Sequence, residues 1–177
     1  MNLIIRPSRD DDVATLASFY IDSVRTDTAS WEYDPPDVAE FTRRRAEVLA
    51  RGYPFFCAEL DGAPVGYAYA SAYRARIGYR FVVEDSIYVD PAFKGRGIGG
   101  KLLMTLIDEC TRLGYRQMVA VIGDSANLGS IGVHRRCGFA DAGTLKSAGW
   151  KFGRWLDVVL MQRPLGLGDT APAAEGT

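Results

Sequence analysis

The sequence predicts a mixed α/β fold (α+β type), in which helices flank a central sheet that is mostly antiparallel with one parallel strand pair. Two strand-like runs, 53–60 and 64–73, are separated by Asp61-Gly62-Ala63, which is typical of an antiparallel hairpin. Farther along, a glycine-rich stretch, 94–100, opens an apolar helix. A short strand, 116–123, follows that helix and is wholly apolar from Met118 onward. A strand without polar alternation is typical of a sheet buried on both faces, so we expect one parallel crossover here.

Each of the other elements is predicted by a local pattern. Apolar runs bounded by turn residues indicate strands, and apolar residues at helical spacing after a capping residue indicate helices. Asp10 to Asp12, for example, provide an N-cap and an acidic first turn. In chain order we expect a strand at 3–7, a helix after Asp12, a helix at about 37–51, the two hairpin strands, a strand at 81–89, a helix from the glycines to about Leu113, the strand at 116–123, a short helix broken at Gly138, and two strands within 145–162.

Length and composition limit the possible classes of protein. The chain has 177 residues, 47% of them hydrophobic and 24% charged, with a net charge of -1. We expect one domain over residues 1–165 and a frayed, polar tail at 166–177. The charge balance offers no general surface for nucleic acid, and no segment reaches the roughly 20 apolar residues of a membrane span. The N-terminus does not resemble a secretory signal, and three widely spaced cysteines favour buried thiols in a reducing cytoplasm.

The glycine-rich stretch matches two nucleotide-binding patterns incompletely. Gly95-x-Gly97-x-x-Gly100 fits the dinucleotide fingerprint, and an acidic residue, Asp124, follows the next strand. That fingerprint normally lies in the first βαβ unit, however, whereas here about half of the chain precedes it. The stretch also nearly spells a P-loop, but Leu102 stands where a magnesium-binding Ser or Thr is needed.

A third interpretation is a loop for the pyrophosphate of coenzyme A. Glycines allow successive backbone N–H groups to point at phosphate oxygens, and the helix N-terminus adds its dipole. Lys94, Arg96 and Lys101 would add positive charge. The plainer alternative is that the glycines only form a tight turn between a strand and a helix.

The segment KGRGIGG resembles the Q/R-x-x-G-x-G/A motif of the GNAT acetyltransferase superfamily, with Lys94, Gly97 and Gly99 at the motif positions. Together with VAVIGDSANLGSIGVHRRCGF and GWKFGRWLDVVLMQ, the chain is similar to the branch that acetylates phosphinothricin and methionine sulfoximine. The resemblance implies the GNAT fold with a splayed parallel strand pair, acetyl-CoA as co-substrate, no metal ion, and a homodimer. It also implies direct acetyl transfer, within a ternary complex, to the α-amino group of a small amino acid or analogue.

The resemblance also implies where coenzyme A would bind. Its pantetheine arm would lie between the strand ending at Val89 and the next parallel strand, with backbone groups of Ile87 and Val89 free to bond it. Asn127 and Ser130 match the opening of the family's second cofactor motif, in which Asn127 would bond the pantetheine arm. Helix capping is the alternative for both residues, and more so for Ser130. The predicted cofactor-binding residues are Ile87, Tyr88, Val89, Lys94, Gly95, Arg96, Gly97, Ile98, Gly99, Gly100, Asn127 and Ser130.

Glu84 is the strongest candidate for a general base. Strand alternation places Glu84 and Asp85 on opposite faces of the strand 81–89. A carboxylate on a central strand has to be paired, hydrated or functional, because burying it alone is costly. The matching glutamate of the resembling branch serves as general base. His134, the only histidine, is the second catalytic candidate, since an ordinary imidazole exchanges protons near neutral pH; a packed, structural histidine is the alternative.

Substrate selection is expected in the loops. Arg74 and Arg76 correspond to two cationic positions of the branch, and a guanidinium suits a carboxylate or phosphinate. Trp31 and Tyr79 could line an apolar side of the pocket. A polyamine, an aminoglycoside or a protein N-terminus is an alternative acceptor, and a non-catalytic acyl-CoA sensor is an alternative function. The aromatic residues Trp150, Phe152 and Trp155 suggest a dimer or core surface.

Overall fold

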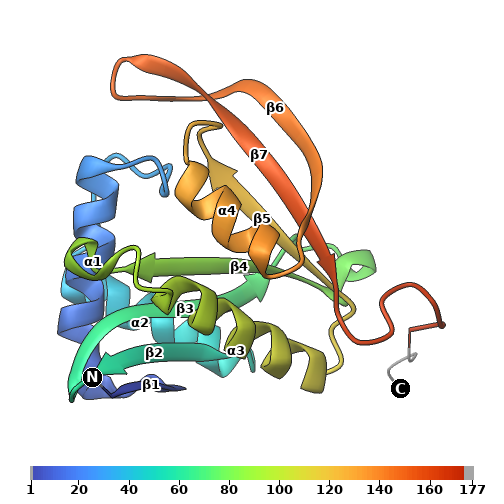
Figure 1. Cartoon of the computed structure of the whole chain (residues 1–177), viewed down its shortest axis with the longest axis horizontal. Helices are drawn as coiled ribbons and strands as arrows, with labels where there is room; N and C mark the ends of the chain where they lie inside the picture. The colour runs from blue at the N-terminus through green and yellow to red at the C-terminus, as the bar shows by residue number, and fades with distance from the viewer. Residues whose placement is uncertain (1, 174–177) are drawn as a thin grey trace.

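The computed structural model of the chain describes residues 2–173 and shows a seven-stranded sheet with helices on both faces (Figure 1). The strand order is β1-β2-β3-β4-β5-β7-β6, and only the β4–β5 pair is parallel. The elements are β1 (Leu3–Pro7), α1 (Val13–Thr26), α2 (Val38–Ala50), β2 (Phe55–Leu60), β3 (Ala63–Ala72), β4 (Val82–Val89), α3 (Ile98–Arg112), β5 (Gln117–Gly123), α4 (Leu128–Arg136), β6 (Ala140–Lys151) and β7 (Arg154–Pro164), with short 3-10 turns at Asp10–Asp12, Ile77–Tyr79 and Pro91–Phe93.

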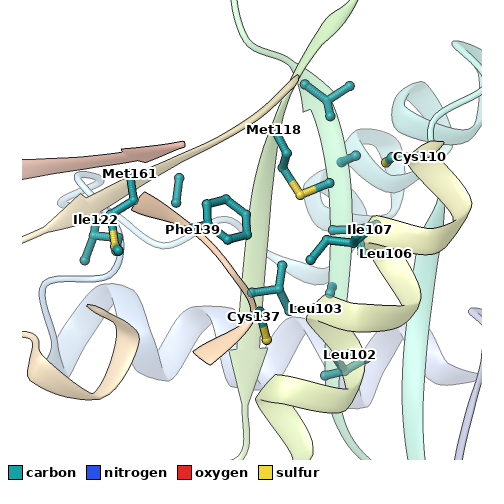
Figure 2. Close-up of a cluster of buried hydrophobic side chains, with 14 of the residues drawn as sticks. Leu102, Leu103, Leu106, Ile107, Cys110, Met118, Ile122, Cys137, Phe139 and Met161 are labelled. Atoms are coloured by element: carbon teal, nitrogen blue, oxygen red, sulfur yellow. The ribbon is translucent and has the colours of Figure 1, made fainter. Parts of the chain in front are cut away.

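Two hydrophobic clusters hold the helices to the sheet. The apolar stripe of α3 packs on one face, where Leu102, Leu103 and Leu106 are fully buried against Met118 of β5 and Phe139 (Figure 2). On the other face, α1 and α2 cover a second cluster that includes Leu16 and Tyr67. Burying one side chain of this size contributes about 1.5–3 kcal/mol, so both faces of the sheet are firmly covered.

Local residue chemistry explains where several elements begin and end. The side chain of Asp37 caps α2 by accepting a hydrogen bond from the backbone N–H of Glu40 at 2.8 Å. The β2–β3 hairpin turns at Asp61 and Gly62, whose φ angles of +50° and +89° are tolerated best by these residue types. The hairpin predicted from the sequence is therefore formed.

The parallel pair separates after three residues. β4 and β5 are paired only from Val82↔Gln117 to Glu84↔Val119, whereas β5 stays paired with β7 as far as Gly123↔Val158. The backbone of β4 beyond Glu84 has lost its partner on that side, and the two strands visibly diverge in Figure 1. The splayed pair implied by the resemblance is confirmed.

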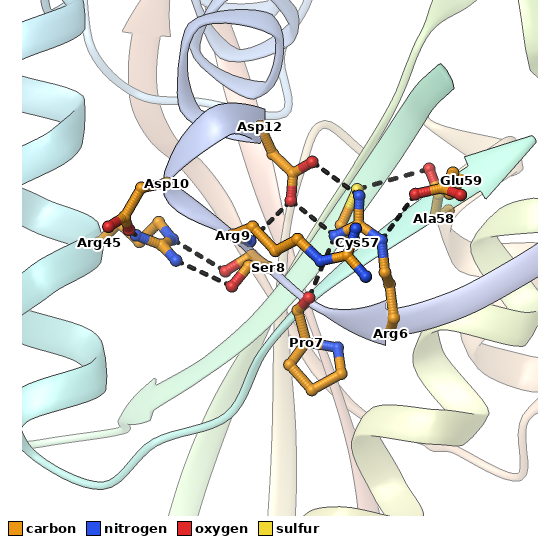
Figure 3. Close-up of polar contacts among 10 residues, drawn as sticks. All are labelled: Arg6, Pro7, Ser8, Arg9, Asp10, Asp12, Arg45, Cys57, Ala58 and Glu59. Atoms are coloured by element: carbon orange, nitrogen blue, oxygen red, sulfur yellow. Dashed lines mark hydrogen bonds and ion pairs between the residues drawn. The ribbon is translucent and has the colours of Figure 1, made fainter. Parts of the chain in front are cut away.

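A polar cluster joins the first elements of the chain (Figure 3). The guanidinium of Arg6 on β1 donates two hydrogen bonds of 2.7 Å to Asp12 and a third to Glu59 of β2. Beside it, Arg45 of α2 bonds Ser8 and Asp10. These contacts tie β1, the first turn and α2 together, well away from the diverging strands.

The predicted fold class and order of elements are confirmed. Within the proposed tail, residues 166–171 form turns and bends, and Arg116 donates hydrogen bonds to the carbonyl oxygens of Gly168 and Ala171. Residues 174–177 lie outside the described part of the chain, so the domain boundary at 165 stays a prediction. No helix between residues 2 and 173 is long and apolar enough to cross a membrane.

Candidate active site

A pocket of about 370 Å³ opens where β4 and β5 diverge. Its walls come from β4, β5, α4, Tyr20 of α1 and the connection between α1 and α2. Seven of the residues predicted for the site line it together, namely Trp31, Glu84, Ile87, Tyr88, Asn127, Ser130 and His134. The strand divergence thus creates the space, and residues far apart in the chain converge on it.

Glu84 faces this pocket without a salt bridge or hydrogen bond from any side chain in residues 2–173. The residue is half-buried, and burial, together with the negative charge of Asp85, raises the pKa of its carboxyl group to about 7. A carboxylate with this pKa is half-ionised at neutral pH and can accept a proton there. The structure therefore gives Glu84 the environment of a general base.

Asp85 lies on the opposite face of β4, as the alternation predicted, and there it meets His134. The Nε2 atom of His134 is 2.9 Å from Oδ2 of Asp85, and Nδ1 is 2.8 Å from the carbonyl oxygen of Ser130. Both side chains are buried: the exposed fraction is 2% for Asp85 and 5% for His134. Sequence reasoning missed this pair, although alternation had placed Asp85 on the face of the strand opposite to Glu84.

Asn127 combines a capping role with a place in the pocket wall. Its side-chain oxygen accepts a hydrogen bond from the N–H of Ser130 at 3.2 Å and thereby starts α4. The helix-capping alternative is therefore present, and it fixes the turn that brings Ser130 and His134 to the pocket.

The glycine-rich stretch forms the N-terminus of α3. Gly95 and Gly97 have φ angles of +80° and +79°, a conformation that glycine adopts without strain. The first-turn N–H groups of an α-helix have no partner within the helix, so those of α3 are available to an anion. Lys94 has an exposed side chain, and a Cβ on Gly99 would lie 3.8 Å from Val89, so the helix start adjoins the end of β4. These residues fit a diphosphate next to the strand gap.

The connection between α1 and α2, which lines the pocket, is held in place by contacts with β6. The ammonium group of Lys151, at the end of β6, donates to the carbonyl oxygens of Asp27 and Ser30 at 3.0 and 2.7 Å. The ring of Trp31 lies where a side chain on residue 149 would be, because a Cβ on Gly149 would come within 2.0 Å of it. Sequence reasoning did not find Lys151; a lysine inside an aromatic run was the available signal.

Comparison with known proteins decides the family. The model of the acetyltransferase (GNAT) family matches residues 16–139. The chain belongs to the GNAT acetyltransferase family. It is 52% identical over 166 residues to a phosphinothricin N-acetyltransferase from Alcaligenes faecalis, covering 94% of this chain and 84% of that one.

Two further relatives agree with this family assignment. An L-methionine sulfoximine/L-methionine sulfone acetyltransferase from Pseudomonas paraeruginosa is 39% identical over 176 residues, covering 97% of this chain and all of the relative. A crystal structure of a phosphinothricin acetyltransferase from Sinorhizobium meliloti in complex with AcCoA superposes with a TM-score of 0.95 at 45% identity, covering 99% and 95% of the two chains. The predicted enzyme class, acetyltransferase, is confirmed.

The pocket does not include all predicted residues. Val89 and the stretch Lys94–Gly100 lie outside the lining, as do Arg74, Arg76 and Tyr79. The guanidinium of Arg74 is exposed and lies over the rings of Tyr73 and Tyr79, at 5.2 and 5.6 Å. These residues belong to the β3–β4 connection, which leaves the sheet near the register pair Ser71↔Glu84. They therefore stand at the Glu84 end of β4, outside the pocket itself.

Three carboxylates stand in the pocket wall, beside His134. Glu32, Glu84 and Asp85 line it, and no Arg or Lys of the described residues does. Two of these carboxylates have partners: Arg44 bonds Glu32 at 2.6 Å, and His134 bonds Asp85. Of the three, only Glu84 has no partner among the described residues. Within residues 2–173, no group of three or more His, Cys, Asp or Glu side chains is arranged to hold a metal ion.

Proposed function

We propose that the protein transfers an acetyl group from acetyl-CoA to the α-amino group of a small amino acid or analogue of the phosphinothricin or methionine sulfoximine type. The observation that carries this proposal is the unpaired, half-buried carboxylate of Glu84 at the gap between β4 and β5. The names of the relatives support the acceptor class, and the complex of the Sinorhizobium meliloti relative with AcCoA supports the donor.

In this reaction Glu84 takes a proton from the acceptor's ammonium group, so that a neutral amine faces the donor. Bound acetyl-CoA supplies the thioester, whose carbonyl carbon the neutral amine attacks. The C–S bond then breaks, and coenzyme A leaves as a thiolate that takes up the second proton lost by the nitrogen. The free backbone N–H groups of β4 near Ile87 and Val89 stabilise negative charge on the carbonyl oxygen, while the start of α3, with Lys94 and Arg96, holds the diphosphate. Asn127 and Ser130 orient the pantetheine arm.

Direct transfer in a ternary complex is favoured over an acyl-enzyme. Cys57, Cys110 and Cys137 are all buried, and burial raises the pKa of the first two thiols to about 12 and that of the third above its usual value. A thiol is a nucleophile only as the thiolate, so these cysteines are poor acyl carriers at neutral pH.

The acceptor's anionic group is assigned to Arg74 and Arg76, with Trp31 and Tyr79 as the aromatic neighbours. An exposed guanidinium beside the Glu84 end of β4 suits a carboxylate or phosphinate, whose amino group then lies next to the base. The unpaired carboxylate of Glu84 favours the ammonium group of the same acceptor, so both ends of a zwitterion have a partner.

We further propose a cytoplasmic homodimer. β6 is an edge strand, and Trp150, Phe152 and Trp155 on its hairpin with β7 have exposed fractions of 48%, 50% and 62%. Exposed aromatic residues on a sheet edge are typical of a protein interface, and a second copy of the chain is the expected occupant. The free, buried thiols favour the cytoplasm. Light scattering of the purified protein should give twice the mass of the 19.4 kDa chain.

The experiment that tests the transfer follows release of free coenzyme A with a thiol reagent. The protein is mixed with acetyl-CoA and a panel of amines: phosphinothricin, methionine sulfoximine, ordinary amino acids, a polyamine, an aminoglycoside and a short peptide. We expect thiol release with the amino acid analogues. Preference for the polyamine would overturn the acceptor class, and acetyl-CoA binding without thiol release for any amine would support a sensor instead.

A further inference from the structure

The Asp85–His134 pair bridges α4 to β4 at the point where the two parallel strands separate. The last backbone pair of β4 and β5 is Glu84↔Val119, and Asp85 is the next residue along β4. His134, 49 residues later, reaches it with Nε2 at 2.9 Å. A side-chain contact thus continues the connection between β4 and the β5–α4 unit beyond the last backbone pair.

The hydrogen bonds define the protonation of His134. The carbonyl oxygen of Ser130 only accepts hydrogen bonds, so Nδ1, 2.8 Å away, has to carry a proton. Nε2 then either donates to the Asp85 carboxylate or accepts from a protonated Asp85. In both states one proton lies between Nε2 and Oδ2, and neither ring nitrogen is free to act as a base.

The surroundings favour the imidazolium–carboxylate form. Burial lowers the pKa of His134, but the hydrogen bond and charge of Asp85, with the Ser130 carbonyl, outweigh it and raise that pKa above its usual value. Oδ1 of Asp85 is buried without a hydrogen-bond partner in the described part of the chain, so the adjacent positive charge is what compensates the carboxylate. The other titratable groups near Asp85 are Glu84 on β4, Cys110 on α3 and Cys137 after α4, and both thiols are neutral at pH 7 because their pKa values are raised.

We propose that Asp85 is a positioning residue for the transfer: paired with a positively charged His134, it fixes α4 beside the pocket and holds a negative charge next to Glu84. A neighbouring negative charge disfavours a second ionised carboxylate, so Glu84 accepts the acceptor's proton more readily. His134 and Asp85 keep their shared proton during this step. His134 therefore supports the site, which differs from the proton-exchange role that the sequence suggested.

The pair is tested without any enzyme assay because His134 is the single histidine of the chain. Nitrogen NMR of protein labelled with ¹⁵N-histidine should show both ring nitrogens protonated at pH 7. One unprotonated ring nitrogen at pH 7 would overturn the assignment. This measurement uses the unaltered protein, so it tests the pair even if a variant does not fold, and it stands whether or not the proposed acetyl transfer is correct.

The Asp85→Asn substitution keeps the shape of the side chain and can still donate a hydrogen bond to Nε2, but removes the charge. We expect the His134 titration to move to lower pH by at least about one unit. Asp108→Asn, which removes an exposed carboxylate from the outer face of α3, is the matched control and should leave it unchanged. The same titration in Asp85→Asn and in the unaltered protein would contradict the pairing.

The kinetic part of the inference rests on the proposed transfer. In Asp85→Asn, the acidic limb of the kcat/KM profile should move to lower pH by about half a unit or more, with the KM for acetyl-CoA changed less than about twofold. If Asp85→Asn is slower but the acidic limb of its kcat/KM profile stays at the same pH, Asp85 contributes only to the stability of the fold. If the unaltered protein acetylates no amine at all, the proposed function fails, while the NMR result still decides the pair.

Discussion

Two groups of carboxylates in this molecule have opposite surroundings. In the cluster that joins β1, the first turn and β2, Asp12 and Glu59 both meet the guanidinium of Arg6, and that hydrogen bond holds the pKa of Asp12 below its usual value. In the pocket, Glu84 meets no cation of the described residues, and burial raises its pKa to about 7. A paired carboxylate stabilises the fold, whereas an unpaired one remains able to accept a proton.

The comparison also explains why the second carboxylate of the pocket matters. Asp85 is buried like Asp12, but its partner is an imidazole on α4 instead of a guanidinium. The pocket therefore contains both arrangements on adjacent residues of one strand: the carboxylate of Asp85 is paired with α4, and that of Glu84 has no partner among the described residues.

The largest effect is expected for Glu84→Gln. Removing a general base lowers turnover by about 10²–10⁴-fold, while acetyl-CoA binding should stay nearly unchanged because the proposed diphosphate contacts lie at α3. Thiol release gives the rate, and calorimetry gives the affinity. Glu47→Gln, on the exposed face of α2, is the control. An unchanged rate at both high and low pH would reject Glu84 as the base.

The pH dependence of the unaltered enzyme should follow the same carboxyl group. Because Glu84 accepts a proton only when ionised, kcat/KM should rise about tenfold per pH unit up to a pH near 7 and then level off.

The raised pKa of Glu84 also means that the folded state holds this proton more tightly than the unfolded chain. Stability should thus fall as pH rises from about 4.5 to 7, and less so in Glu84→Gln. Urea unfolding at several pH values measures the free energy of unfolding of both proteins. The same pH dependence in Glu84→Gln and in the unaltered protein would contradict this prediction.

Asp12→Asn tests the paired carboxylate. Removing one partner of a buried ion pair lowers the free energy of unfolding by about 3 kcal/mol, which urea unfolding at pH 7 should show. Because the pKa of Asp12 is lowered in the folded state, its contribution is present above the usual value of 3.8 and is lost as the pH falls through the lowered one. The difference between variant and unaltered protein should therefore shrink in acid.

The control for that change is Asp10→Asn, whose side chain is 95% exposed and bonds Arg45. The Asp10→Asn substitution should lower the free energy of unfolding by less than about 1 kcal/mol. Equal losses in both variants would mean that burial of the Asp12 pair does not decide its contribution.

The smallest effect is expected for Arg74→Ala. The KM for acceptors that carry a carboxylate or phosphinate should rise about tenfold with little change in kcat, since the contact is made equally before and during the reaction. Arg80→Ala removes a guanidinium of the same connection that lies over Phe81 at 4.5 Å and should have little effect. A similar rise for acceptors without an anionic group would contradict the role of Arg74.

Much of the site could be predicted because its signals are local. Alternation along the strand 81–89 assigned Glu84 and Asp85 to opposite faces, and the density of glycines around Gly97 indicated a backbone with positive φ at the start of a helix. The contacts that complete the site are between distant residues: Asp85 with His134 across 49 positions, and Lys151 with Asp27 across 124. No pattern within a short window records such pairs.

By itself, the sequence determined the order of strands and helices along the chain and the glycine-rich helix start, because hydrophobic period and turn chemistry act over a few residues. It also separated Glu84 from Asp85 by alternation, and the resemblance to the family then implied Glu84 as the candidate base. Only the tertiary structure decided that β4 and β5 part after Glu84, that His134 is bonded on both ring nitrogens, and that Arg74 lies outside the pocket. These features depend on which groups meet across the sheet, and that is set by packing between elements that the chain brings together only when it folds.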